Sequence, residues 1–191
     1  MGRVAAAHES IDTAAVKAQV IALTGRRGAG KTAIGQAVAV QLGWRFASFG
    51  DYIRSVARTR GRPESDVVLQ DLGATFVERD PQGLVAGVLD TVSWKPGEPV
   101  VVDGIRHERI LRLLEERVAP LPVVLVYVDV PEEQRLERLR QRGEPTDRDV
   151  EEHSTEEEVR TVLPKLAAFT VTGVGASTAA AGAIIDRLGR S

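Results

Sequence analysis

Short apolar runs alternate with longer stretches of helical character along this sequence. The apolar runs occupy residues 20–23, 45–49, 100–102, 123–128 and 169–171. Residues 100–102 and 123–126 are apolar at every position, which is typical of central strands that are covered on both faces. The alternation therefore predicts an α/β fold in which a parallel five-stranded sheet lies between two layers of helices.

The stretches between these runs predict the helices. They span residues 31–42, 51–60, 65–78, 82–92, 108–118, 132–142, 155–168 and 178–188, with breaks at Gly43, Gly61, Pro81 and Gly143. A chain of 191 residues is long enough for one α/β domain with a substantial core and too short for two. We expect a single domain over residues 18–191, preceded by an N-terminal extension at residues 1–17.

The composition excludes several classes of function and of site. The formal net charge is only −2, so we expect no broad attraction to nucleic acid or to a membrane surface. The absence of cysteine excludes disulfides, thiolate metal sites and cysteine nucleophiles. The N-terminus lacks the apolar core of a secretion signal, and no apolar run approaches the ~20 residues of a membrane span. A cytoplasmic protein with a small-molecule partner is expected, and its oligomeric state is left open.

The sequence GRRGAGKT, residues 25–32, joins the first predicted strand to the first predicted helix. Its glycines let successive backbone N–H groups approach an anion, because no Cβ stands in the way. In such a loop Lys31 reaches the β and γ phosphates and the Thr32 hydroxyl binds Mg²⁺. The spacing matches the Walker A pattern in full and predicts a P-loop NTPase fold that binds ATP. The residues expected around the nucleotide are Gly25, Gly28, Ala29, Gly30, Lys31, Thr32 and Ala33.

Asp103 ends the apolar run 100–102 and is followed by Gly104. Ligands gather at the carboxyl ends of strands in open α/β sheets, so this carboxylate is expected beside the phosphate loop. There it would serve Mg²⁺ through a water molecule of the metal's shell. The structural alternative is a turn aspartate that caps the following helix.

Two further segments resemble the nucleoside monophosphate kinases of the P-loop superfamily, and the adenylate-kinase-like members in particular. Residues 48–54, SFGDYIR, are similar to the S-x-G-D-x-x-R segment of those kinases, and residues 103–106, DGIR, are similar to their Asp-Gly-x-Pro-Arg segment. DGIR together with LQDLG at residues 69–73 looks closer to the deoxynucleoside monophosphate kinases. The chain departs from the family pattern because no proline follows Gly104 and no arginine stands shortly before Leu69.

The resemblance implies an acceptor site built on helices at about residues 51–92. It implies that Arg54 and Arg106 hold the acceptor phosphate, with Asp51 beside them, while Asp103 serves the metal. Planar guanidinium groups suit this task, since two anions must meet despite their repulsion. Asp51 is also expected to cap the helix that it begins. Taken alone, Arg54 would be interpreted as a solvated helix arginine.

A basic helix face is predicted after the fourth strand. Arg135, Arg138 and Arg142 fall within about 60° of one another at 100° per residue. The resemblance implies a short lid at about residues 135–150, in which Arg138 and Arg142, joined by Arg148, stabilise the transferred phosphoryl group. An ordinary helix with ion pairs to its own glutamates is the alternative.

The sequence thus predicts an enzyme that moves the γ-phosphoryl group of ATP, with Mg²⁺, onto a nucleoside or deoxynucleoside monophosphate. Lys31, Arg106, Arg138 and Arg142 are its expected catalytic residues. One alternative is another small-molecule kinase, such as a dephospho-coenzyme A kinase, for which an acidic D-x-D segment is expected where this chain has SFGD. A second alternative is a nucleotide-dependent switch that transfers no phosphate. His8, His107 and His153 receive no role, because their spacing suits no metal site.

Overall fold

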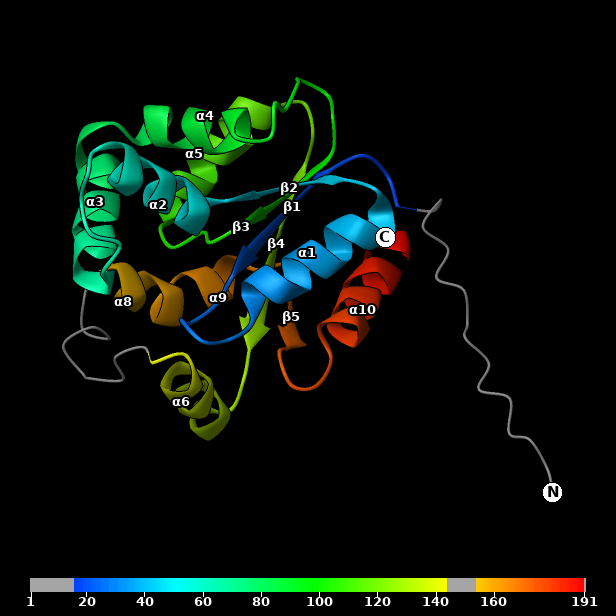
Figure 1. Ribbon diagram of the computed structural model, residues 1–191. Coiled ribbons are helices and arrows are strands. Elements are labelled where there is room, and N and C mark those ends of the chain that lie inside the picture. Colours follow the sequence, from blue (N-terminus) through cyan, green and yellow to red (C-terminus); the bar gives the residue numbers. More distant parts are fainter. Residues whose placement is uncertain (1–15, 144–153, 191) are drawn as a thin grey trace.

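The computed structural model describes residues 16–143 and 154–190 of the chain (Figure 1). Within these residues five parallel strands form one sheet. They are β1 (Val20–Thr24), β2 (Arg45–Ser48), β3 (Val100–Asp103), β4 (Val123–Asp129) and β5 (Phe169–Thr172). Their order is β2-β3-β1-β4-β5, which places the first strand in the middle. The predicted parallel five-stranded sheet is confirmed.

The register brings three strand ends to one level. Leu23 of β1 and Ser48 of β2 both pair with Asp103 of β3. The loops that follow these strands therefore leave the sheet at the same edge. In open α/β sheets this carboxyl edge is where ligands bind.

Two helices cover one face of the sheet, α1 (Lys31–Leu42) and α10 (Ser177–Gly189). Ile21 and Val101 of the central strands share a buried cluster with Ile34 of α1 and Ile184 of α10. Neighbouring residues on a strand point to opposite faces, so these strand positions define the α1 and α10 side of the sheet.

The opposite face carries a larger set of helices. Val102 of β3 belongs to a second buried cluster together with Leu84, Leu114 and Leu163, which come from three different helices. The sheet is thus the middle of three layers, as predicted. The helices on this side are α2 (Phe49–Thr59), α3 (Asp66–Arg79), α4 (Pro81–Asp90), α5 (Glu108–Val118), α8 (Ser154–Thr161) and α9 (Leu163–Leu166). The remaining described helix, α6 (Glu132–Gln141), follows β4 at the carboxyl edge (Figure 1).

Two predicted boundaries are wrong. The helix expected at residues 155–168 is divided into α8 and α9, because Pro164 near the start of α9 has no N–H with which to continue the ladder of α8. Asp51 does not cap the helix after β2. That helix begins at Phe49, and its cap is Ser48, whose hydroxyl accepts a hydrogen bond from the Asp51 N–H at 3.2 Å.

The predicted lid at residues 135–150 is described only as far as Gly143, so Arg148 lies outside the described residues. The predicted extension at residues 1–17 likewise falls almost entirely outside them. No described helix combines the length and the apolar character that crossing a bilayer requires.

Candidate active site

The loop between β1 and α1 has the glycine-dependent backbone that its sequence predicts. Gly25, with φ of 144°, passes so close to β4 that a Cβ there would lie 2.3 Å from the Val128 carbonyl oxygen. Gly30, with φ of 92°, stands directly before α1, and no side chain caps that helix. The first N–H groups of α1 therefore have no side-chain partner and face the loop, where a polyphosphate can accept their hydrogen bonds.

Lys31 extends back along this loop. Its Nζ donates a hydrogen bond to the Arg26 carbonyl oxygen at 2.9 Å, and the residue is only 8% exposed. Burial, and next the positive charge of Arg106, lower the pKa of Lys31 to about 7. The ammonium form of Lys31 thus lacks a full counter-charge in this site. A bound polyphosphate would supply that charge.

Thr32 and Asp103 meet at the carboxyl edge of the sheet. The Thr32 hydroxyl donates a hydrogen bond to Asp103 Oδ2 at 2.6 Å. The other carboxylate oxygen, Oδ1, is buried and has no hydrogen-bond partner among the described residues. Burial raises the pKa of Asp103, and the Lys31 ammonium opposes that shift. A hydroxyl beside an unsatisfied carboxylate oxygen fits a hydrated Mg²⁺, whose preferred ligands are oxygens.

A cleft of about 290 Å³ opens between the phosphate loop and helices α2, α3 and α4. At one end it is lined by loop residues such as Gly28, Lys31 and Thr32. Its far wall is largely apolar, with Phe49, Ile53, Leu69, Val77, Leu84 and Ile110. The phosphate loop and the apolar wall are thus parts of one continuous cleft.

Three of the predicted arginines line this cleft: Arg54 of α2, Arg106 of the loop after β3, and Arg142 at the end of α6. Burial lowers the pKa of Arg106, and Asp103 partly restores it. The Arg54 guanidinium forms an ion pair with Asp51 at 2.9 Å. Asp51 is not among the cleft-lining residues, and its contact with the acceptor stays a prediction.

Arg138 is absent from the described lining of the cleft, although it was predicted beside Arg142. Its guanidinium donates hydrogen bonds to the Ala29 carbonyl oxygen at 3.2 Å and to the Gly173 carbonyl oxygen at 2.7 Å. In this conformation Arg138 joins the phosphate loop to the turn after β5.

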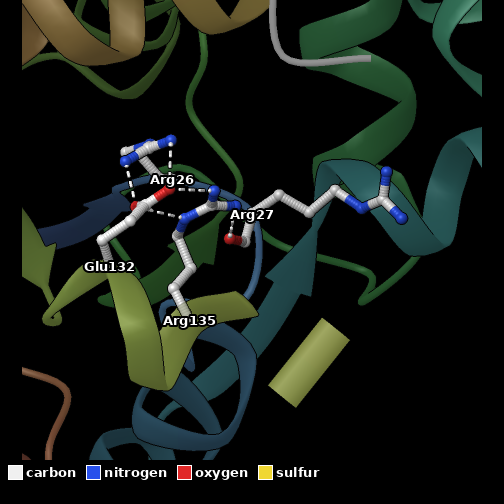
Figure 2. Close-up of polar contacts among 4 residues, drawn as sticks. All are labelled: Arg26, Arg27, Glu132 and Arg135. Carbon is white, nitrogen blue, oxygen red and sulfur yellow. Dashed lines mark hydrogen bonds and ion pairs between the residues drawn. The ribbon is translucent and has the colours of Figure 1, made fainter. Parts of the chain in front are cut away.

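Arg135 supports the same loop from inside the protein (Figure 2). It is 2% exposed, is paired with Glu132 at 2.7 Å, and donates a hydrogen bond to the Arg27 carbonyl oxygen at 3.3 Å. Glu132 also pairs with Arg26. The hydrogen bond from Arg135 is the main reason that the pKa of Glu132 falls to about 2.

Sequence reasoning gave ion pairs to the helix's own glutamates as an alternative, which the pair of Arg135 with Glu132 matches, but it missed the contacts of this pair with the phosphate loop. It also missed the ion pair between Arg27 of the loop and Asp66 of α3, at 2.9 Å. Two arginines inside the glycine-rich loop, at positions 26 and 27, are the signal that points to acidic partners. The sequence does not indicate which partners these are.

Comparison with known proteins identifies the family and agrees with the fold. Residues 21–160 match the family described as AAA domain. The UPF0200 protein of Pyrobaculum aerophilum is 35% identical over 129 residues, which cover 67% of this chain and 68% of that protein. The chain belongs to the AAA domain family and to the UPF0200 proteins. A UPF0200 protein of Aeropyrum pernix is 30% identical over 123 residues, and this match spans 64% of each of the two proteins.

Solved kinase structures share the fold of this AAA domain protein. A gluconokinase from Sinorhizobium meliloti superposes with a TM-score of 0.60 at 21% identity, over 90% of this chain and 94% of that chain. Shikimate kinase from Acinetobacter baumannii, in complex with shikimate, gives a TM-score of 0.59 at 20% identity, over 92% and 95% of the two chains. The fold is therefore a P-loop kinase fold.

Proposed function

We propose that the protein is a phosphotransferase that moves the γ-phosphoryl group of ATP onto the phosphate of a nucleoside or deoxynucleoside monophosphate. The observation that carries the proposal is the cleft that is lined by the phosphate loop, by an apolar wall and by arginines of three other elements. A nucleoside monophosphate has the matching chemistry, with an anionic end for the arginines and a flat, largely apolar base for the apolar wall.

The charges that line the cleft favour a phosphate acceptor. The described lining contains five cationic side chains, Arg27, Lys31, Arg54, Arg106 and Arg142, and two carboxylates, Asp66 and Asp103. Transfer between two phosphates brings anions together, so cations must lie between them. An excess of cations over carboxylates meets this need.

A phosphate acceptor is already ionised and requires no general base. An acceptor hydroxyl, in contrast, profits from a carboxylate that takes its proton. Within the described lining, Asp103 accepts the hydrogen bond of Thr32 at the metal position, and Asp66 is paired with Arg27. Each carboxylate is thus already engaged through one oxygen, Asp66 with Arg27 and Asp103 with Thr32, and we assign the free Oδ1 of Asp103 to the hydrated metal rather than to an acceptor hydroxyl.

Mg²⁺ would be held by Thr32 and, through water, by Asp103. When bound, it would neutralise charge on the phosphate oxygens as the phosphoryl group transfers. In our proposal Lys31 holds the β and γ phosphates, Arg106 and Arg54 orient the acceptor phosphate, and Arg142 stabilises the transferred group. Arg138 acts by fixing the loop, and its predicted direct contact with the phosphoryl group remains a prediction for the ATP-bound protein.

The second candidate is a kinase that phosphorylates a hydroxyl group on a small anionic molecule. The shared fold of the gluconokinase and the shikimate kinase favours it, since Arg54 and Arg106 would also suit a carboxylate. Dephospho-coenzyme A kinase activity belongs to the same hydroxyl-acceptor class. The third candidate, a switch without transfer, does not explain why Arg54, Arg106 and Arg142 line the cleft.

An acceptor panel separates these candidates. ADP release from Mg²⁺-ATP is measured with ribo- and deoxyribonucleoside monophosphates, dephospho-coenzyme A, gluconate and shikimate. We expect stimulation by at least one monophosphate. Stimulation by hydroxyl acceptors alone would establish the second candidate, and ATP binding without stimulation by any acceptor would favour the switch.

A further inference from the structure

The short loop between β3 and α5, residues 104–107, carries Arg106 into the cleft. Its first half is fixed to β1. The N–H groups of Gly104 and Ile105 both donate to the Leu23 carbonyl oxygen at 3.1 Å, and the Thr24 hydroxyl donates to the Ile105 carbonyl oxygen at 2.7 Å. The backbone immediately before Arg106 is therefore held by a central strand.

The second half of the loop is fixed by one carboxylate from a distant part of the sequence. Glu158 of α8 accepts a hydrogen bond from the Glu108 N–H at 2.8 Å and pairs with His107 Nδ1 at 2.9 Å. His107 stands at the N-cap position of α5, but its side chain makes no capping hydrogen bond. Glu158 supplies the missing cap and places a negative charge at the positive end of the helix dipole.

Glu158 is itself held in place. Its neighbour Val159 is fully buried in the core cluster, and Leu163 of α9 is buried beside it. The His107 side chain is 12% exposed, and its other ring nitrogen, Nε2, is buried with no hydrogen-bond partner in the described chain. Within the described residues, the imidazole therefore has one polar contact to orient it, the one with Glu158.

Arg106 is thus the one residue between two anchors, one on β1 and one on α8. We infer that Glu158 is a positioning residue that sets the place of the Arg106 guanidinium in the cleft, through His107 and the first turn of α5. This inference rests on the proposed function for its effect on catalysis, but the contact itself is independent of the reaction.

The kinetic test compares Glu158→Ala, Glu158→Gln and the matched control Glu157→Ala, whose parent side chain is exposed on the same helix. Because a displacement of about 1 Å can cost on the order of a hundredfold, we expect Glu158→Ala to lower kcat/KM for the acceptor by roughly 10- to 100-fold. Glu158→Gln retains an oxygen that can accept one of the two hydrogen bonds and should give an intermediate loss. The KM for ATP and the Tm of the Gln variant should stay close to wild type, and Glu157→Ala should match wild type throughout.

A nuclear magnetic resonance test works without any acceptor. The chain has three histidines, so His107 is assigned by comparison with His107→Asn. We expect wild-type His107 to carry its proton on Nδ1, and Glu158→Ala to shift both this ring and the Arg106 Nε–H resonance, whereas Glu157→Ala shifts neither. An unmoved Arg106 resonance in Glu158→Ala would overturn the inference whatever the reaction is. If the wild-type protein transfers phosphate to no acceptor, while Glu158→Ala still shifts the Arg106 resonance, only the proposed function would be overturned.

Discussion

The two ends of the cleft are built in different ways. At the phosphate-loop end the carbonyl oxygens of residues 26–29 are bound by Lys31, Arg135 and Arg138, so the backbone itself is fixed. At the other end the wall consists largely of side chains from separate helices. One of these helices, α3, has a single buried residue, Leu72, so little of it is fixed in the core. A site made from backbone is preorganised for one ligand class, whereas a side-chain wall is free to vary with the acceptor. The comparison explains why the donor is easier to identify than the acceptor.

The largest effect on the phosphate-loop end is expected from Lys31→Ala. We expect phosphoryl transfer to fall by about a thousandfold for every acceptor, since one preorganised electrostatic group contributes on the order of 10²–10³ in rate. ADP release measures the rate, and circular dichroism checks that the variant is folded. A loss restricted to one acceptor would contradict the assignment of Lys31 to the donor.

Arg135→Leu should destabilise the phosphate-loop end as a unit. It removes a buried guanidinium, takes away one donor to the Arg27 carbonyl oxygen and leaves Glu132 paired with Arg26. We expect a loss of about 2–3 kcal/mol in the free energy of unfolding, a figure already reduced for solvent screening because Glu132 is half exposed. Urea titration measures it. Arg140→Leu is the matched control, because Arg140 is an exposed arginine of the same helix paired with Glu137. Equal effects of the two substitutions would show that the buried network does not stabilise the loop.

Arg54→Ala should affect the acceptor end alone. Without one of the guanidinium groups that face the acceptor phosphate, KM for the acceptor should rise about tenfold, which corresponds to about 1.4 kcal/mol, while ATP affinity stays constant. The matched control is Arg58→Ala, one turn along α2, where the arginine is exposed and paired with Glu64. Unchanged acceptor kinetics in Arg54→Ala would remove Arg54 from the site.

The smallest expected effect is a pH dependence of stability. The pKa of Glu132 is lowered from 4.5 to about 2, so its ion pairs contribute fully above about pH 5 and are lost as the pH falls through 2. Glu132→Gln should therefore have a lower Tm than wild type at pH 7, and the difference should shrink as the pH is lowered toward 2. Solvent screening limits its size, because the Glu132 side chain is 50% exposed. A difference that stays constant down to pH 2 would contradict the depressed pKa.

The difference between the two ends of the cleft also explains what could be predicted from the sequence. The order of the elements and the phosphate loop could be predicted, because apolar runs and glycine spacing directly constrain the backbone. The sequence also predicted Asp103 beside the phosphate loop, but not its direct hydrogen bond with Thr32. The anchoring of Arg138 to backbone carbonyls could not be predicted, because it depends on where α6 docks on the loop.

The contacts of Asp66 and Glu158 could not be predicted from the sequence either. Each of them joins parts of the chain that lie far apart, 39 residues for Asp66 with Arg27 and 51 for Glu158 with His107. A lone acidic residue on a helix has many possible partners. Only the packing of α3 beside the phosphate loop and of α8 beside the start of α5 selects one.

The central claim is that one cleft binds a donor polyphosphate and an acceptor phosphate at the same time. Its most direct test is equilibrium binding of a bisubstrate compound, in which the terminal phosphate of ATP is linked through a further phosphate to a nucleoside. We expect wild-type protein to bind this compound at least about tenfold more tightly than ATP, because the compound engages both ends of the cleft, and we expect Arg54→Ala to abolish most of the difference. An affinity equal to that of ATP, in the wild type and in the variant alike, would contradict the claim.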